Sequence, residues 1–237
     1  QGEGLRDETL ASLREEDDSA ILEVNGEPIA VEQAEFTVTN TNDSGEGSLR
    51  AAIQQANNTD GADTINFNSE LSGDIISVTS RVFSITDDLT ITGLGAEELT
   101  LDAGGNNRLF AIGTEGLEVE IEGLTLTGGT ASNPGGAIVN RGNLTLTDTI
   151  ISDNSSRDNG GAIESTGELT LTDSTVSGNS ASSRGGGISN SGDLTLTNST
   201  VSDNFANDGG GGIRNNSGED LTLTNSTVSG NSASSGG

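Results

Sequence analysis

A short hydrophobic sequence recurs along the second half of the chain at an almost constant interval. Copies of Leu-Thr-Leu-Thr begin at Leu144, Leu169, Leu194 and Leu221, so the intervals are 25, 25 and 27 residues. Two further aliphatic series keep the same rhythm, Leu126, Ile151, Val176 and Val201 in one and Ile138, Ile163, Ile188 and Ile213 in the other. Three series with one period predict a stack of similar coils, each lying on the coil before it.

Alternation within each copy indicates strands. Side chains of a strand point alternately to opposite sides, so Leu-Thr-Leu-Thr turns both Leu inward and both Thr outward. In the coil before Leu144, Val119 and Ile121 occupy the places that the two Leu hold in later coils. Residues 124–127 therefore belong to the second strand of that coil. We therefore predict an all-β fold, a right-handed single-stranded parallel β-helix with about 25 residues and three strands per coil.

Polar residues of the turns follow the same period. Asparagines fall three residues after the inward residue of each second strand, at Asn154, Asn179, Asn204 and Asn231. Stacked asparagines can satisfy the backbone groups of a turn from coil to coil. We expect these four to form a structural ladder.

The first quarter of the chain differs from the repeats and predicts three parts. Residues 1–35 form an acidic extension, in which strands near Ile21–Val24 and Ile29–Val31 flank a turn. Residues 36–63 form an N-terminal cap, with a strand from Phe36 and a helix over 48–57 begun by Ser48. Residues 64–237 form the β-helix, whose C-terminal end we expect to be open.

Charge narrows the range of partners. The chain has 37 acidic residues, nine Arg, no Lys and no His, which gives a net charge of −28. Nucleic acids and anionic membranes repel such a surface, and no apolar run is long enough to span a bilayer. No Cys is present, so no disulfide forms. The absence of Cys and Met suits an extracellular protein, and a start at Gln1 leads us to expect a mature secreted chain, with an internal fragment as the alternative.

Two segments carry a resemblance to known families. Gly160–Ile163 together with Val176–Asn179 resembles the paired repeat motifs of bacterial polymorphic outer-membrane proteins, which begin the second motif with Phe where this chain has Ile or Val. Residues 36–67 are similar to the CSLREA domain, with Gly47 in place of its Cys. The resemblance, within the secreted β-helix proteins of the pectate-lyase-like superfamily, implies a bacterial surface protein of structural or adhesive type.

An enzyme is the alternative from another class. Asn58-Thr59-Asp60 and Asp87-Asp88 resemble motifs of polygalacturonases, whose His and Lys this chain lacks. A Ca²⁺-dependent polysaccharide lyase, with Arg157 as base, stays open, as does simple polysaccharide binding. Its weak metal candidates are turn residues that recur with the repeats, Asp153, Asp158, Asp203 and Asp208.

A third function is suggested by the outward Thr pairs. They are Thr145 and Thr147, Thr170 and Thr172, Thr195 and Thr197, and Thr222 and Thr224. A flat array of this kind can order water in an ice-like spacing, which leaves ice binding open. Thr is also simply a good strand residue on a solvated face.

The first choice among these functions is a non-catalytic structural or adhesive protein outside the cell. Its expected partners are extracellular glycans or copies of itself docking head to tail as a filament, and it needs no cofactor beyond weakly bound Ca²⁺. The docking surfaces would combine strands of the extension with the last coil. The residues expected there are Ile21, Leu22, Val24, Ile29, Val31, Leu221, Leu223 and Val228.

Overall fold

The computed structural model describes residues 22–24, 27–29, 33–216 and 218–235. They belong to two units, Gln1–Glu32 and Gln33–Gly237. In the first unit β1 (Leu22–Val24) pairs with β2 (Glu27–Ile29) in antiparallel orientation, with Leu22 opposite Ile29. The antiparallel pairing agrees with two neighbouring strands in the extension, but the second strand is Glu27–Ile29 and not the expected Ile29–Val31.

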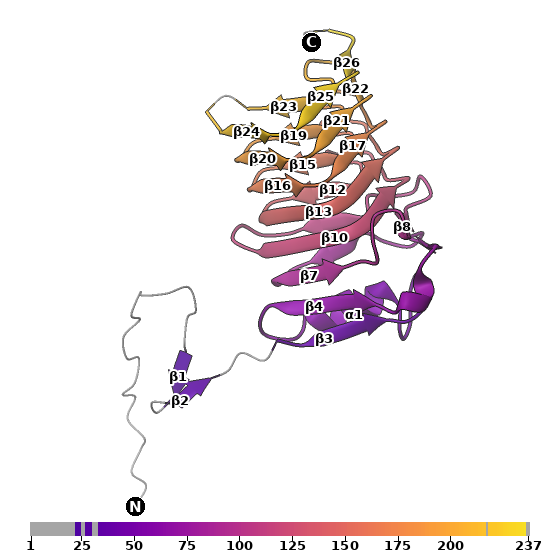
Figure 1. The fold of residues 1–237 in the computed structure, drawn as a ribbon, viewed down its shortest axis with the longest axis vertical. Coiled ribbons are helices and arrows are strands. Elements are labelled where there is room, and N and C mark those ends of the chain that lie inside the picture. The colour runs from indigo at the N-terminus through magenta and orange to yellow at the C-terminus, as the bar shows by residue number, and fades with distance from the viewer. Residues whose placement is uncertain (1–21, 25–26, 30–32, 217, 236–237) are drawn as a thin grey trace, which may run out of the picture. The chain divides into compact units, whose positions relative to one another are not determined.

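The second unit is a parallel β-solenoid whose coils are stacked along one axis (Figure 1). Its largest component, the 13-stranded sheet, contains two columns of strands. The first column is β3 (Glu35–Val38), β4 (Asp63–Phe67), β7 (Leu89–Thr92), β10 (Glu118–Thr127), β13 (Asn143–Ser152), β16 (Leu169–Thr172), β20 (Leu194–Thr197) and β24 (Leu221–Thr224). The second column is β5 (Asp74–Ser77), β8 (Leu99–Asp102), the second halves of β10 and β13, β17 (Thr175–Ser177), β21 (Thr200–Ser202) and β25 (Thr227–Ser229).

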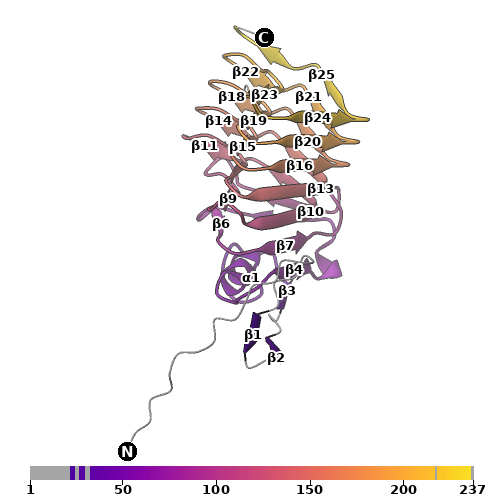
Figure 2. The same ribbon diagram turned by 90° about the vertical axis from the view of Figure 1, so that its left-hand side faces the viewer.

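Two narrower sheets complete the coils from β10 onward, and Figure 2 shows their strands one above the other. The five-stranded sheet consists of β11 (Thr130–Ala131), β14 (Ser155–Ser156), β18 (Ser180–Ala181), β22 (Phe205–Ala206) and β26 (Ser232–Ala233). The six-stranded sheet consists of β6 (Phe83–Ile85), β9 (Phe110–Ile112), β12 (Ile138–Asn140), β15 (Ile163–Ser165), β19 (Ile188–Asn190) and β23 (Ile213–Asn215).

The repeat register follows the sequence period. Leu144, Leu169, Leu194 and Leu221 are successive partners, and the Ile series of the six-stranded sheet is paired in the same way. Val119 pairs with Leu144, and the second half of β10 pairs with the second half of β13. The predicted all-β solenoid fold is therefore confirmed. The loop after β23 contains the two extra residues of the last interval.

From the coil of β10 onward, each coil has a fourth strand that the sequence did not predict, whereas the coils of β4 to β6 and of β7 to β9 have the three predicted strands. The strands of the five-stranded sheet are two residues long, and in all of them except β26 one side chain of the pair is buried, a small Ala or Ser such as Ala181 or Ser156. Such a pair leaves no hydrophobic alternation to detect. The predicted count of three strands per coil is therefore correct for the earlier coils and too low by one for the later ones.

A short helix lies beside the first strands of the solenoid. The helix α1 (Leu49–Ala56) begins at Ser48, whose hydroxyl oxygen accepts a hydrogen bond from the Ala51 amide at 3.2 Å. Its buried face is Leu49, Ala52, Ile53 and Ala56, and it contacts β3, β4 and β6. The predicted helix over 48–57 is confirmed to within two residues. A single 3₁₀ turn, η1 (Ser69–Leu71), follows β4.

The strand before this helix is already part of the stack. β3 pairs in parallel with β4, Phe36 opposite Ile65, although the helix separates them along the chain. The sequence analysis placed this strand in a cap that precedes the solenoid. The first strand pair of the solenoid, β3 with β4, cannot be recognised as a repeat in the sequence, because the inserted helix disturbs the 25-residue interval.

Asp43 ties the loop before the helix to a later coil. Its carboxylate accepts hydrogen bonds from the Arg50 guanidinium at 2.8 Å and from the backbone amides of Thr79 and Ser80 at 3.1 and 2.7 Å. Burial alone would raise the pKa of Asp43, but these hydrogen bonds and the charge of Arg50 outweigh it and lower the pKa to about 2. Arg50 also lies over the Phe83 ring, 4.6 Å from its centroid.

The interior is a narrow, aliphatic column. Buried Leu, Ile and Val side chains come from every coil of the second unit except the last, and the tilted rings of Phe83 and Phe110 have 5.4 Å between their centroids. Each coil buries too few side chains to fold alone, so stability must come from stacking.

Candidate functional site

The predicted asparagine series forms a continuous ladder inside the turns. The Oδ1 atoms of Asn179 and Asn204 each accept a hydrogen bond from the backbone amide of the Asn one coil earlier, at 2.9 Å in both cases, and Oδ1 of Asn154 accepts from the Gly129 amide at 2.8 Å. Asn204 donates in the same way to Asn231 at 3.0 Å. The ladder lies in the interior, so its role is structural.

A second ladder was missed by the sequence analysis. The Thr149 amide donates to the Ser174 hydroxyl at 3.1 Å, the Ser174 amide to Ser199 at 3.2 Å, and the Ser199 amide to Ser226 at 3.1 Å. It lies at the bend between the two columns of the 13-stranded sheet. A hydroxyl residue at the same place in every Leu-Thr-Leu-Thr copy was the available indication.

The outward Thr pairs are in register, as their spacing requires. Thr145, Thr170, Thr195 and Thr222 are successive partners, and so are Thr147, Thr172, Thr197 and Thr224. One coil earlier the same two columns contain Glu120 and Glu122. Thr90 and Thr92 occupy these columns in the coil before the two glutamates, so the glutamates interrupt the Thr array, and ice binding stays a prediction.

The four aspartates considered for metal binding lie in different turns. Asp153 and Asp203 have positive φ angles of 57° and 56° and stand two coils apart, with Gly178 in the coil between them. Asp158 and Asp208 lie in loops before the six-stranded sheet. Within the described residues, no group of three or more acidic side chains is arranged to hold a metal ion.

The two motifs that resemble polygalacturonase motifs each form local hydrogen bonds. Asn58 and Thr59 donate side-chain hydrogen bonds to carbonyl oxygens of the α1 helix, those of Gln54 and Gln55. Asp88 accepts from the Glu118 amide at 2.9 Å. These hydrogen bonds stabilise the helix end and a turn.

The residues expected at docking surfaces are only partly described. Leu221, Leu223 and Val228 are 42%, 46% and 46% exposed, so the inward side chains of the last coil are open to solvent. Leu22, Val24 and Ile29 belong to the β1–β2 hairpin, and Ile21 and Val31 lie outside the described residues. Head-to-tail docking stays a prediction.

The arginines are gathered in one region, which the sequence analysis did not foresee. We use the name arginine face for the six-stranded sheet with the loops that lead into its strands, residues 78–82, 103–109, 132–137, 157–162, 182–187 and 207–212. Five of the seven arginines within the described residues lie on it, Arg81, Arg108, Arg157, Arg184 and Arg214. The other two adjoin it, because Arg141 follows β12 and Arg50 contacts Phe83 of β6.

The arginine face is the exception on an acidic molecule. Its acidic residues are Asp158, Glu164 and Asp208, so its five arginines outnumber them, whereas the whole chain has a net charge of −28. A local excess of positive charge attracts anions even when the net charge is strongly negative.

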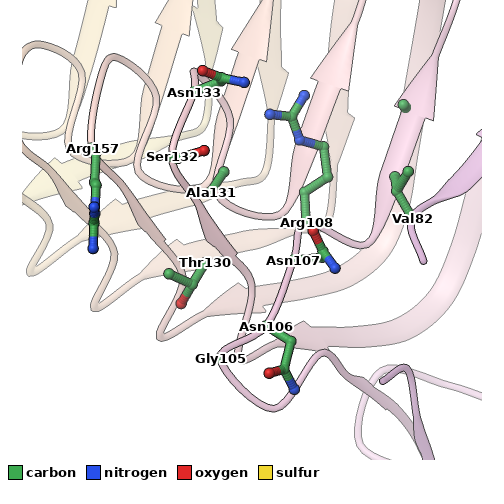
Figure 3. A pocket seen from close by; sticks show the side chains of 11 residues that line it. Val82, Gly105, Asn106, Asn107, Arg108, Thr130, Ala131, Ser132, Asn133 and Arg157 are labelled. Carbon is green, nitrogen blue, oxygen red and sulfur yellow. The ribbon is translucent and has the colours of Figure 1, made fainter. Parts of the chain in front are cut away.

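A hollow of about 570 Å³ opens on the arginine face (Figure 3). Its lining contains Arg108 and Arg157, the amides of Asn106, Asn107 and Asn133, the hydroxyls of Thr130 and Ser132, and no acidic residue. Figure 3 shows the two arginines on opposite sides of the segment from Thr130 to Asn133. Volumes of this size suit small ligands.

Arg108 has an unusual environment for a charged group. Burial lowers the pKa of its guanidinium, and the nearby positive charge of Arg141 lowers it further. The single ion pair among the described residues joins Arg50 to Asp43, so neither Arg108 nor Arg157 has an acidic partner there. A half-buried guanidinium without a counter-charge is destabilised, and an anion in the hollow would relieve that cost.

Glu164 is the other perturbed group of this face. Burial raises its pKa, with a small further contribution from Asp158, while the Ser189 hydroxyl and the charge of Arg214 act in the opposite direction. Its Oε2 atom is buried and has no hydrogen-bond partner within the described residues. The site therefore favours the neutral carboxyl group.

Among the described residues, no helix has the length and hydrophobicity to cross a membrane. The family model described as "Right handed beta helix region" matches residues 87–237. A search of curated proteins and a search of solved structures each found no match. The parallel coils observed here and a match over more than half of the sequence lead to one conclusion: the chain belongs to the right-handed β-helix family.

Proposed function

We propose that this protein is a non-catalytic, extracellular adhesive β-helix of a bacterial surface, which holds acidic glycans on its arginine face. The supporting observation is the gathering of arginines along the six-stranded sheet of an otherwise acidic chain. Glycans with carboxylate or sulfate groups offer repeated negative charges, and several coils contribute an arginine to the same face of the solenoid.

Adhesion is tested by retention on immobilised acidic polysaccharide, with neutral dextran as the reference. We expect retention on the acidic matrix that weakens as salt rises, because exposed charges are screened. Arg184→Gln and Arg214→Gln should each lower the affinity roughly threefold, since each removes a positive charge from the arginine face.

A matched control separates the face from the net charge. Thr172→Glu also makes the net charge more negative by one unit, but on the 13-stranded sheet, where Glu122 already occupies the same column. This variant should bind as the unchanged protein does. Equal losses for Arg184→Gln and Thr172→Glu, or no retention at low salt, would contradict adhesion through the arginine face.

The non-catalytic part of the proposal has its own test. Incubation of the purified protein with acidic polysaccharides and Ca²⁺ should release no new reducing ends and no unsaturated products. Cleavage that disappears in Arg157→Gln would instead establish the lyase alternative.

A further inference from the structure

The hollow on the arginine face has the features of a specific subsite. We propose that it binds a tetrahedral oxyanion, a sulfate or phosphate ester group of the glycan. This inference rests on the proposed adhesion and names the chemical group that the hollow selects.

The donors around the hollow come from separate parts of the coil stack. Arg108 is supplied by the loop before β9, Asn133 by the loop before β12 and Arg157 by the loop before β15. Asn106 contributes an amide whose bonds to the carbonyl oxygens of Ala103 and Gly104 are long, 3.5 and 3.4 Å. Such donors have capacity left for a ligand.

This arrangement favours a tetrahedral group over a carboxylate. A carboxylate offers two oxygens in one plane, which a single guanidinium fork can satisfy. The two arginines here stand on opposite sides of the segment from Thr130 to Asn133; the Asn133 amide belongs to that segment, and the amides of Asn106 and Asn107 lie on the Arg108 side (Figure 3). An ester of sulfate or phosphate offers three outward oxygens, so it can accept from several sides at once.

The energetics point the same way. Arg108 is half-buried, has no acidic partner among the described residues, and lies near the like charge of Arg141. No lining residue is acidic, so nothing in the hollow repels an anion. The hollow is also large enough to admit the sugar unit that carries the ester, at about 570 Å³.

The experiment is calorimetric titration with three sugars of one size: glucose 6-sulfate, glucose 6-phosphate and glucuronate. We expect one or both esters to bind at least tenfold more tightly than glucuronate. The two ester arms show which source the hollow prefers. Arg108→Gln and Arg157→Gln should each weaken ester binding by roughly tenfold, the usual effect of losing a charge-assisted hydrogen bond.

Thr172→Glu is the matched control, because it makes the net charge more negative by the same one unit on the 13-stranded sheet, away from the arginine face and the hollow. It should alter ester binding less than twofold, and thermal unfolding verifies that each variant is folded. Equal affinity for glucuronate, or unchanged binding in both Arg108→Gln and Arg157→Gln, would overturn the subsite. If polymer adhesion then persists and still weakens in Arg184→Gln, the proposed function stands without the subsite; if adhesion is absent as well, both fail.

Discussion

Asn179 links three successive coils from within one turn. Its amide donates to the carbonyl oxygens of Ile151 and Ser177 at 2.9 and 3.0 Å and to Oδ1 of Asn204 at 2.9 Å. Its own Oδ1 accepts from Asn154. An alanine in its place would leave several buried groups without a partner, in an interior that water does not reach.

We therefore expect Asn179→Ala to lower the free energy of unfolding by about 3 kcal/mol, since each buried group left unpaired costs about 1–3 kcal/mol. Urea denaturation followed by circular dichroism measures the change. Asn231→Ala is the comparison, because Asn231 is partly exposed and water can replace its bonds. Equal losses in the two variants would show that the ladder does not depend on burial.

Glu164 gives the protein a pH dependence with a definite sign. Its folded-state pKa is raised by burial, so its contribution to stability is complete below the ordinary pKa of Glu, about 4.3, and is lost as pH rises through the raised value. Glu164→Gln should therefore raise the thermal midpoint at about pH 8 and leave it unchanged at about pH 4. Glu168→Gln makes the same change at an exposed position of the same coil and should shift neither midpoint. A midpoint lowered by Glu164→Gln at the higher pH would contradict this assignment.

At the scale of the element, the loops that lead into the six-stranded sheet restrict which residues they can contain, because the backbones of successive coils approach each other closely there. A Cβ atom at Gly161 would collide with the carbonyl oxygen of Gly186 in the next coil. Successive coils thus come together closely here, which sets the spacing of the arginines that these loops present.

Gly161→Ala should lower the free energy of unfolding by about 1–3 kcal/mol, because overpacking forces neighbouring backbone to shift. Gly113→Ala is the matched control: neither glycine has a positive φ, and the nearest atom to a Cβ at Gly113 is the Ile85 carbonyl oxygen at an ordinary 3.7 Å. We expect Gly113→Ala to leave the midpoint of urea unfolding nearly unchanged. A Gly161→Ala protein as stable as the unchanged one would mean that the coils can separate without cost.

At the scale of the whole molecule, stability is a balance between stacking and charge repulsion. A net charge of −28 on 237 residues opposes the compact state, and the stack brings acidic turns of neighbouring coils together. The burial of aliphatic side chains and the hydrogen bonds of the two polar ladders oppose this repulsion and stabilise the stack.

We expect the thermal midpoint to rise as NaCl increases toward about 0.5 M, because the Debye length becomes shorter than the distance between coils' outer charges. We further propose that Ca²⁺ binds weakly at the turn acids and raises the midpoint above that in chelator at matched ionic strength. Scanning calorimetry measures both effects. A midpoint that responds to ionic strength alone would leave Ca²⁺ without a role.

Much of this architecture was predictable because each coil repeats its own local pattern. The alternation of Leu144 with Thr145, carried from coil to coil, indicates which side chains point inward, and the common interval gives the stacking register. Asn179 could be placed in its turn for the same reason, since it keeps a fixed distance from an inward residue. Residues that share one place in a repeat meet in space whenever the repeats stack.

The arginine face was decided only by the tertiary structure. Arg81, Arg108, Arg157, Arg184 and Arg214 are separated by 27, 49, 27 and 30 residues, so they share no single place in the repeat. The winding of the chain returns every lead-in loop to one side of the solenoid, whatever its length, and the arginines gather there. A spacing search finds residues that recur at one offset, whereas lateral stacking also brings together residues at different offsets, because neighbouring loops lie only one coil apart.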